Sequence, residues 1–196
     1  MNKICVFCGS SKGIKDIYAS QAESLADAFI ERNIDLVYGG ANIGLMKSIA
    51  DRVLARGGNV TGVMPGSLAK REILHVGMTE TILVDDMQER KRIMEELSDG
   101  FITMPGGFGT IDELFEMLSW NQLGIIHKPV GIYNVDHYYD ALIEWLDHAV
   151  DMKFVRPEHR ANIIVDADPY SLLEKMESYQ GQVAEKWVDR LKEKGY

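Results

Sequence analysis

The stretch FITMPGGFGTIDELFEM (residues 101–117) passes from a β-branched, apolar run through a glycine-rich turn into a helical pattern. A strand followed by a tight turn and a helix is the repeating unit of parallel α/β folds. The same alternation recurs along the chain. Strand patterns occupy residues 3–8, 34–40, 59–65, 80–85, 101–107, 128–134 and 162–167. Helical patterns occupy residues 16–33, 43–58, 86–100, 110–123, 137–152 and about 169–192.

Seven strand patterns joined mostly by helices predict a parallel sheet that is covered by helices on both faces. We therefore expect a single doubly wound, Rossmann-like domain over residues 1–196, because no linker, repeat or low-complexity tract interrupts the alternation. The composition, with 46% hydrophobic and 26% charged residues, is that of an ordinary globular domain.

The charge balance argues against several classes of partner. The formal net charge is -9, and no Lys/Arg run is long enough to follow a phosphate backbone, so we expect no nucleic-acid or anionic-membrane binding. No apolar stretch approaches the roughly 18 residues of a membrane helix, and the N-terminus lacks a secretory pattern. A cytoplasmic protein is the prediction.

Cys5 and Cys8 form a C-x-x-C pattern, which in other contexts marks a redox pair or half a metal site. In a strand an odd offset directs the two side chains to opposite faces, so we predict no such pair. The five histidines are scattered without zinc-like spacing. We expect neither a metal nor a cofactor.

Glycine-rich stretches follow four of the strand patterns, at residues 8–13, 38–44, 64–67 and 104–109. Ligands of doubly wound folds bind at the carboxyl ends of the strands, so four such loops predict a pocket for a phosphorylated ligand. The first loop lacks G-x-G-x-x-G, and Tyr38-Gly39 stands where an acidic ribose-binding residue would be, which argues against a dinucleotide. Gly44 is followed by Leu45 and not by Lys-Ser/Thr, so no P-loop is present.

The spacing of residues 104–117 allows two interpretations. In one, Thr110 is the N-cap of a helix and Glu113 completes a capping box, with the glycines shaping the entry. In the other, the free N–H groups at the helix start bind a phosphate, and Glu113 faces the attached sugar. The spacing alone does not separate a helix cap from a phosphate cradle.

The motif PGGFGTIDE (105–113) resembles the P-G-G-x-G-T-x-x-E signature of the LOG (Lonely Guy) family, the cytokinin-activating phosphoribohydrolases. CVFCGSS, VYGGANIGLM, VTGVMPGSL, REI, DMQERK and WNQLGIIHKPVGIYN follow the family's order from the first strand, and the similarity continues to about residue 155. The family implies a Rossmann-like homodimer that hydrolyses the N-glycosidic bond of N6-modified adenosine 5'-monophosphates, such as N6-isopentenyl-AMP, or of AMP. The products are the free base and ribose 5-phosphate.

Carried over to this chain, the resemblance makes Arg90 and Glu113 the catalytic pair. It also implies further substrate-binding residues: Glu72, Lys91, Gly106, Gly107, Phe108, Gly109, Thr110, Ile111, Asp112 and Ser119. Taken without the resemblance, the position of Arg90 favours a solvated charge paired with Glu89 or Glu95 over a catalytic role.

These residue types suit the reaction. Cleavage of a bond between ribose and a purine develops positive charge on the sugar, which a carboxylate such as that of Glu113 stabilises. The departing base gathers negative charge, and the Arg90 guanidinium can hydrogen-bond to the base or hold the phosphate. Three departures from the family pattern, Ala41, Lys47 and Gln88, bear on substrate preference and not on the reaction.

Two other functions compete with hydrolysis. A non-catalytic nucleotide- or cofactor-binding carrier of Rossmann-like fold would share the glycine loops but would not need Arg90 and Glu113 together. Family members have often been labelled "possible lysine decarboxylase", and that chemistry needs a Schiff-base lysine with partners for pyridoxal phosphate, which no pattern here singles out.

Overall fold

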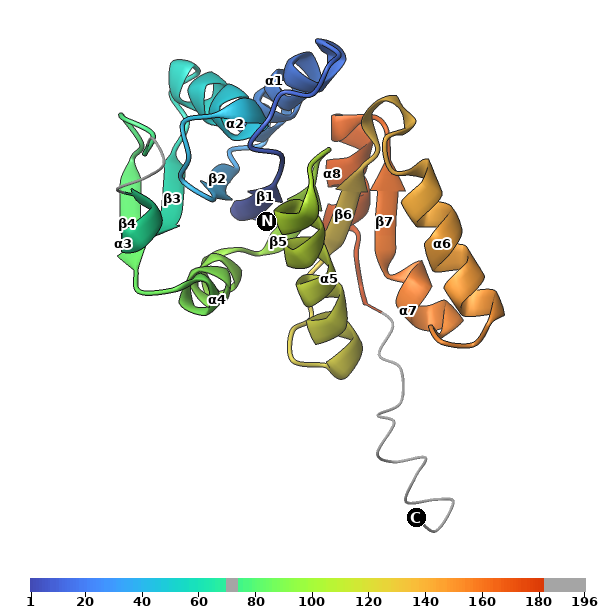
Figure 1. Ribbon diagram of the computed structural model, residues 1–196. Helices are drawn as coiled ribbons and strands as arrows, with labels where there is room; N and C mark the ends of the chain where they lie inside the picture. The colour runs from blue at the N-terminus through green and yellow to red at the C-terminus, as the bar shows by residue number, and fades with distance from the viewer. Residues whose placement is uncertain (70–73, 182–196) are drawn as a thin grey trace.

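The computed structural model describes residues 1–69 and 74–181. These residues form a parallel sheet of seven strands in the order β4-β3-β2-β1-β5-β6-β7 (Figure 1). The strands are β1 (Lys3–Phe7), β2 (Asp35–Tyr38), β3 (Val60–Pro65), β4 (Glu80–Val84), β5 (Gly100–Thr103), β6 (Val130–Tyr133) and β7 (Ile163–Asp166). The predicted Rossmann-like α/β class is confirmed.

The helices that connect these strands are α1 (Ile17–Glu31), α2 (Gly44–Ala55), α3 (Gly66–Ala69), α4 (Met87–Leu97), α5 (Phe108–Leu123), α6 (Asp140–Asp151), α7 (Pro157–Ala161) and α8 (Pro169–Glu177). A 3₁₀ turn, η1 (Val135–His137), precedes α6. No helix among the described residues is long and apolar enough to cross a membrane.

The strand order reverses at the centre of the sheet. The strand β1 pairs with β2 on one side and with β5 on the other. The chain moves outward through β2, β3 and β4 and then returns to β5, so the loops after β1 and β5 diverge in opposite directions. A crevice forms at such a switch point, outside the carboxyl ends of the strands.

Alternate residues of β1 supply two separate apolar cores. Ile4, Val6 and Cys8 pack in the core beneath α1, α2 and α8, whereas Cys5 and Phe7 pack in the core beneath α4, α5 and α6 (Figure 1). Both cysteines are buried free thiols. Their placement on opposite faces is as the odd spacing predicts.

Two predicted helix boundaries are wrong. The helix α5 begins at Phe108 with Gly107 as its N-cap, three positions before Thr110, the N-cap of the capping-box interpretation. The helix α8 ends at Glu177, and residues 178–181 are not helical. Its last buried side chain is that of Met176, and Gly181 adopts a left-handed conformation with φ 55°. The remainder of that expected helix, residues 182–192, lies outside the described residues.

Candidate active site

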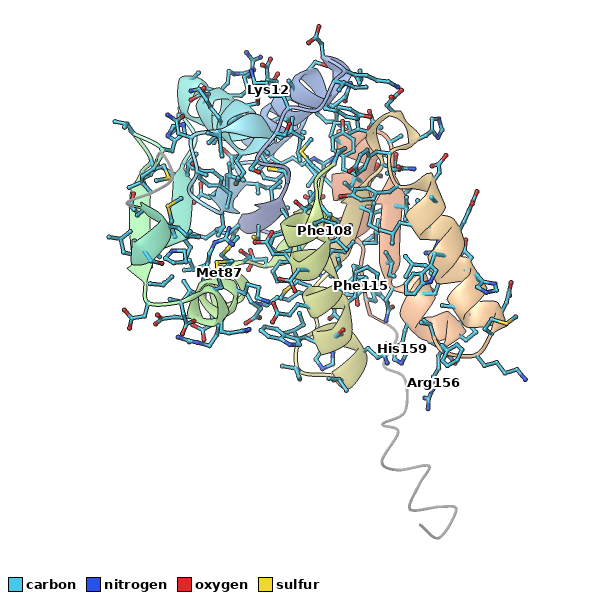
Figure 2. The ribbon with its side chains drawn as sticks, in the orientation of Figure 1. Lys12, Met87, Phe108, Phe115, Arg156 and His159 are labelled. Carbon is cyan, nitrogen blue, oxygen red and sulfur yellow. The ribbon has the colours of Figure 1, made fainter. Side chains whose placement is uncertain are left out.

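A cavity of about 270 Å³ opens at the switch point, between the loops that follow β1, β2, β3 and β5. One part of its wall is polar and includes Ser10, Arg90, Thr110 and Glu113. Another part is apolar and consists chiefly of Met46, Met64, Leu68 and Met87. Figure 2 labels two lining residues, Met87 on α4 and Phe108 at the start of α5.

Arg90 and Glu113 meet in the polar wall. The Arg90 Nη1 atom donates to Glu113 Oε1 over 2.9 Å, and the two side chains are only 13% and 10% exposed. Arg90 Nε also donates to the Val63 carbonyl of β3 over 3.0 Å. Two anchors therefore fix the guanidinium, and its partner is Glu113, not Glu89 or Glu95 as a solvated helix charge would have it.

Burial raises the pKa of the Glu113 carboxyl above its ordinary value, and the neighbouring Asp112 carboxylate adds to the rise. The positive charges of Arg90 and Lys91 act in the opposite direction. A carboxylate in such a poorly solvated place interacts strongly with any positive charge that develops beside it.

Gly39, at the end of β2, is the reason that Arg90 fits. A Cβ atom added at Gly39 would lie 2.2 Å from Arg90 Nη2. Any larger residue would therefore displace the guanidinium from its place beside Glu113. Sequence reasoning placed Gly39 in a glycine loop but did not predict this close approach, because the partner lies on a distant helix.

Of the two interpretations of residues 104–117, the capping box does not form. Because α5 begins at Phe108, Glu113 lies in the second turn, and its carboxylate accepts from Arg90 and not from the Thr110 N–H. The N-cap Gly107 has no side chain to cap the helix, and the first α-helical bond runs from the Ile111 N–H to the Gly107 carbonyl. The N–H groups of residues 108–110 thus precede the first intrahelical bond and stand at the positive end of the helix dipole.

The structure requires glycine at one position of this loop and not at the others. A Cβ at Gly106 would lie 2.2 Å from Thr110 Oγ1, so the fold itself requires glycine there. A Cβ at Gly107 or Gly109 would meet nothing within 4 Å, although both residues line the cavity. Gly109 is the second residue of α5, in its first turn, and is exposed. The protein's own packing does not require glycine at position 109, and the absence of a side chain leaves this part of the cavity wall open.

Lys91 points to a different place from Arg90. Its ammonium, on a side chain 9% exposed, lies 2.8 Å from Glu116 and 3.2 Å from Asp112. Burial lowers the pKa of Lys91, but hydrogen bonds to Glu116 and Asp112 outweigh burial and raise it above its ordinary value. Lys91 thus joins α4 to α5 by ion pairs. A Schiff-base lysine needs a lowered pKa so that its amine is uncharged, whereas the pKa of Lys91 is raised.

The predicted substrate-binding residues divide into three groups. Those that line the cavity are Arg90, Gly107, Phe108, Gly109, Thr110, Asp112 and Glu113. Gly106, Lys91, Ile111 and Ser119 do not line it. Glu72 lies outside the described residues.

Ser119 belongs to a second hollow, of about 220 Å³, between α5, α6 and α7. Phe115, Trp145 and His159 also line this hollow, and Phe115 and Trp145 pack edge to face with ring centroids 5.7 Å apart. Figure 2 labels Phe108 at one end of α5 and Phe115 further along the same helix, toward His159 on α7.

Known proteins resemble this chain closely. Residues 46–176 match a family model described as possible lysine decarboxylase. A probable cytokinin riboside 5'-monophosphate phosphoribohydrolase of Oryza sativa subsp. japonica is 46% identical over 190 residues, which are 97% of this chain and 78% of that protein. A cytokinin riboside 5'-monophosphate phosphoribohydrolase of Arabidopsis thaliana is 48% identical over 177 residues, 90% of this chain and 83% of that protein.

The chain belongs to this phosphoribohydrolase family. The resemblance found in the motifs is thereby confirmed over most of the chain. The decarboxylase description of the family model finds no counterpart in the cavity, where no lysine lines the wall among the described residues.

Solved structures share the fold of the phosphoribohydrolase family at lower identity. A molybdenum cofactor binding protein from Rippkaea orientalis gives a TM-score of 0.68 at 20% identity, covering 90% of this chain and 96% of that one. The molybdenum cofactor carrier protein of Chlamydomonas reinhardtii gives 0.68 at 17% identity, covering 91% of this chain and 99% of that one. Likeness at this level shows the fold alone.

Proposed function

We propose that this protein hydrolyses the N-glycosidic bond of adenosine 5'-monophosphates, either N6-modified or AMP itself, to the free base and ribose 5-phosphate. The observation that carries the proposal is the buried Arg90–Glu113 pair in the wall of a cavity whose glycine loop leaves space for a phosphate. The names of the phosphoribohydrolases to which the chain is 44–48% identical give the same reaction.

The phosphate would lie against the N–H groups of residues 107–110, where the helix dipole favours negative charge. The Thr110 hydroxyl would add a donor. Gly107 and Gly109 have no Cβ on the cavity side, so the phosphate oxygens can approach the backbone. In this arrangement Glu113, one turn beyond Gly109, faces the ribose.

In the reaction the bond between C1' of the ribose and the base nitrogen breaks, and the base takes the bonding electron pair. Water supplies a hydroxyl group to C1' and a proton to the base, so no other reactant is needed. The Glu113 carboxylate stabilises the positive charge on the ribose and directs the attacking water. The Arg90 guanidinium, held beside it, offers further N–H donors to the base or to the phosphate.

Glu113→Gln tests the catalytic part of the proposal. The amide oxygen still accepts from Arg90, so the fold should persist, while turnover of N6-isopentenyl-AMP or AMP should fall by about 10²- to 10⁴-fold. Glu23→Gln is the control, since it makes the same change at an exposed carboxylate on α1 that does not line the cavity. A fully active Glu113→Gln enzyme would show that Glu113 has no catalytic role.

A different result would favour the carrier function. Purified protein that binds AMP tightly but hydrolyses neither nucleotide would be a nucleotide-binding carrier, for which the Arg90–Glu113 pair is only a structural ion pair. Chromatographic detection of free base and ribose 5-phosphate separates the two outcomes.

The proposal includes roles for Lys91, Glu72 and Ser119 in substrate binding, which rest on the family resemblance alone. It also includes a homodimer. Support for a dimer comes from apolar side chains exposed on and beside the hollow of Ser119, among them Trp145 at 51% and Leu123 at 68% exposure. Light scattering that gives a monomer mass at micromolar concentration would contradict the dimer.

A cytoplasmic location completes the proposal. The buried thiols of Cys5 and Cys8 lie on opposite faces of the sheet and are both free, which suits a reducing compartment. Recovery of the native protein mainly from a membrane or secreted fraction would contradict this location.

A further inference from the structure

Two tyrosines outside the cavity, neither of which contacts Arg90 or Glu113 in the bonds described here, donate hydrogen bonds to the loop before α5, called here the phosphate loop (residues 104–110). The Tyr138 hydroxyl donates to the Gly106 carbonyl over 2.6 Å, and the Tyr139 hydroxyl donates to the Met104 carbonyl over 2.8 Å. Between these two positions, the Pro105 carbonyl accepts from the Gly9 N–H over 3.0 Å. Three successive carbonyls of the loop are thus tied to segments far away in the sequence.

These ties determine where the loop's N–H groups point. In a trans peptide the C=O and N–H bonds are antiparallel, and the described residues contain no cis peptide. Because Tyr138 holds the Gly106 carbonyl, the N–H of Gly107 in the same peptide unit must point away from Tyr138. Gly107 is the N-cap of α5 and lines the cavity. A peptide between two glycines rotates easily, so an external hydrogen bond is what selects one orientation.

The segment that carries Tyr138 is shaped for this contact at some cost. The two residues before it, Asp136 and His137, have φ values of 50° and 61°, a left-handed conformation that is unfavourable for non-glycine residues. Lys15, from the loop after β1, forms an ion pair with Asp136. Asn134 braces the turn, since its side chain accepts from the Tyr139 N–H and donates to Asp140.

Tyr138 itself contributes little to the core. Its side chain is 44% exposed, and its ring contacts the edges of Tyr18 and Tyr139. Tyr139, in contrast, is buried, and burial raises the pKa of its phenol. The hydroxyl of Tyr138 therefore has one clear contact, the phosphate loop, and its removal leaves the ring packing intact.

We propose that Tyr138 is a positioning residue for the 5'-phosphate, which fixes the Gly106–Gly107 peptide so that its N–H faces the ligand. The proposal rests on the proposed function, in which the loop of residues 106–110 holds the phosphate of the nucleotide. Tyr138 touches neither the ribose nor the base, and it acts only through the loop.

The test is Tyr138→Phe, which keeps the ring and removes the donor. We expect the KM for N6-isopentenyl-AMP or AMP to rise about three- to tenfold, as for the loss of one hydrogen bond, with kcat within about twofold. The thermal midpoint should stay within about 2 °C of that of the wild type. Tyr170→Phe is the matched control, because its hydroxyl bonds to Glu31 on the face covered by α1 and α8.

A binding measurement separates this proposal from the proposed function. In a Glu113→Gln background, where AMP is not consumed, calorimetry should give an AMP Kd about three- to tenfold weaker when Tyr138→Phe is added. An unchanged Kd, a fall in kcat at constant KM, or an equal effect of Tyr170→Phe would overturn the role of Tyr138. If the wild type hydrolyses neither nucleotide but Tyr138→Phe still weakens AMP binding, the hydrolase proposal fails and the positioning role stands.

Discussion

Glu113 and Gly109 lie one turn apart on α5, and different constraints act on them. The carboxylate of Glu113 is held by Arg90, and burial raises its pKa. Gly109 contacts nothing that would exclude a methyl group. The first residue is explained by an observed partner, whereas the protein's own packing does not require glycine at the second.

Gly109→Ala separates a ligand cradle from a mere helix start. Alanine favours a helix interior over glycine by about 0.5–1 kcal/mol, so the free energy of unfolding should stay constant or rise. The added methyl group would project into the cavity and raise the KM for the nucleotide by about tenfold or more. Urea denaturation together with steady-state kinetics measures both effects.

The contradicting outcome for Gly109→Ala is a variant with wild-type KM. Gly106→Ala is the informative comparison, because its Cβ would clash with Thr110 and should reduce stability as well as activity. Loss of activity without loss of stability is the signature that only Gly109 should give.

At the residue level, the family resemblance predicts Arg90 and Glu113 as a catalytic pair. It does not show that the two side chains are in contact, which the structure does. The capping box of Thr110 and Glu113 does not form because the N-cap is Gly107, three residues before Thr110, and a spacing rule is sensitive to a shift of that size. The roles of Gly39 and Tyr138 depend on atoms contributed by remote segments. No local pattern encodes such approaches.

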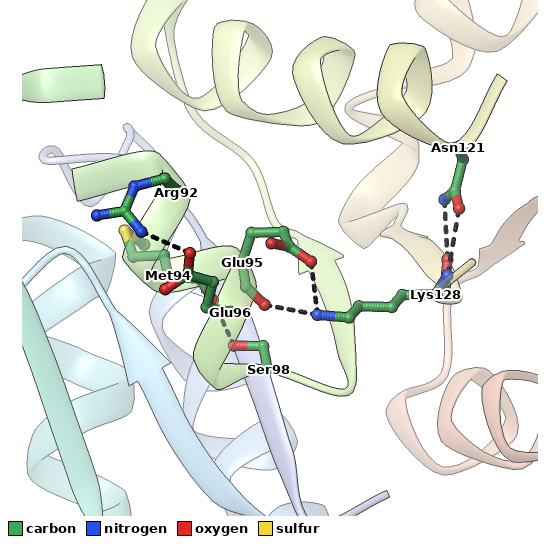
Figure 3. A network of polar contacts seen from close by, with 7 residues as sticks. All are labelled: Arg92, Met94, Glu95, Glu96, Ser98, Asn121 and Lys128. Atoms are coloured by element: carbon green, nitrogen blue, oxygen red, sulfur yellow. Dashed lines mark hydrogen bonds and ion pairs between the residues drawn. The ribbon is translucent and has the colours of Figure 1, made fainter. Parts of the chain in front are cut away.

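The helices α4 and α5 are joined by ion pairs and hydrogen bonds at both ends. Near the cavity, Arg90 and Lys91 of α4 reach carboxylates of α5. At the far end, Lys128 donates to the backbone carbonyl of Glu95 over 2.7 Å and to its carboxylate over 2.6 Å (Figure 3). The backbone of Lys128 is in turn joined to the Asn121 side chain of α5 by two hydrogen bonds.

Lys128→Met tests the contribution of the contact between Lys128 and Glu95 at the far end of these helices. The variant keeps the aliphatic stem but leaves the Glu95 carboxylate, only 13% exposed, without its partner. We expect the free energy of unfolding to fall by about 1–3 kcal/mol. Arg92→Met is the control, because Arg92 pairs with Glu96 where both side chains are 53% exposed (Figure 3), and such a pair contributes about 0–1 kcal/mol. Equal losses in chemical denaturation would argue against a special role for Lys128.

Element existence was predictable because buried strands and amphipathic helices have different hydrophobic periods. The short helices α3 and α7 and the turn η1 were not predicted, because three to five residues give no period to detect. The helical pattern continues in the sequence past Glu177, but α8 ends there, and a period does not show where the backbone leaves the helix, as it has by Gly181.

For the whole molecule, the sequence predicted the site through topology. Glycine-rich loops at the carboxyl ends of four strands converge only if those strands are parallel and adjacent, and the order β3-β2-β1-β5 brings them together. The second hollow, between α5, α6 and α7, was not predicted, since it depends on how three helices pack. That residues 1–196 form one domain stays a prediction.

Four carboxylates have pKa values that their hydrogen bonds hold below the ordinary value. Asp27 accepts from Arg52 and Arg56 between α1 and α2, and those contacts lower its pKa. Burial raises the pKa values of Asp51, Asp99 and Asp166, but the hydrogen bonds that these carboxylates accept outweigh burial and lower the pKa values overall. For Asp166 the bonds from Lys175, Ser171 and the Asp168 N–H lower the pKa to about 2 from 3.8.

The sign of the resulting pH dependence follows from these pKa values. A carboxyl group whose pKa is lower in the folded state stabilises the fold fully above its unfolded pKa and loses that effect as the pH falls toward the folded value. We expect the free energy of unfolding to decline between about pH 4 and pH 2.

Asp166→Asn should lower stability at pH 7 and flatten this decline, while Glu23→Gln, at an exposed site on α1, should leave it unchanged. Glu113, with its raised pKa, acts in the opposite direction. Urea unfolding at a series of pH values measures the slope, and an identical slope for Asp166→Asn and wild type would contradict the assignment to Asp166.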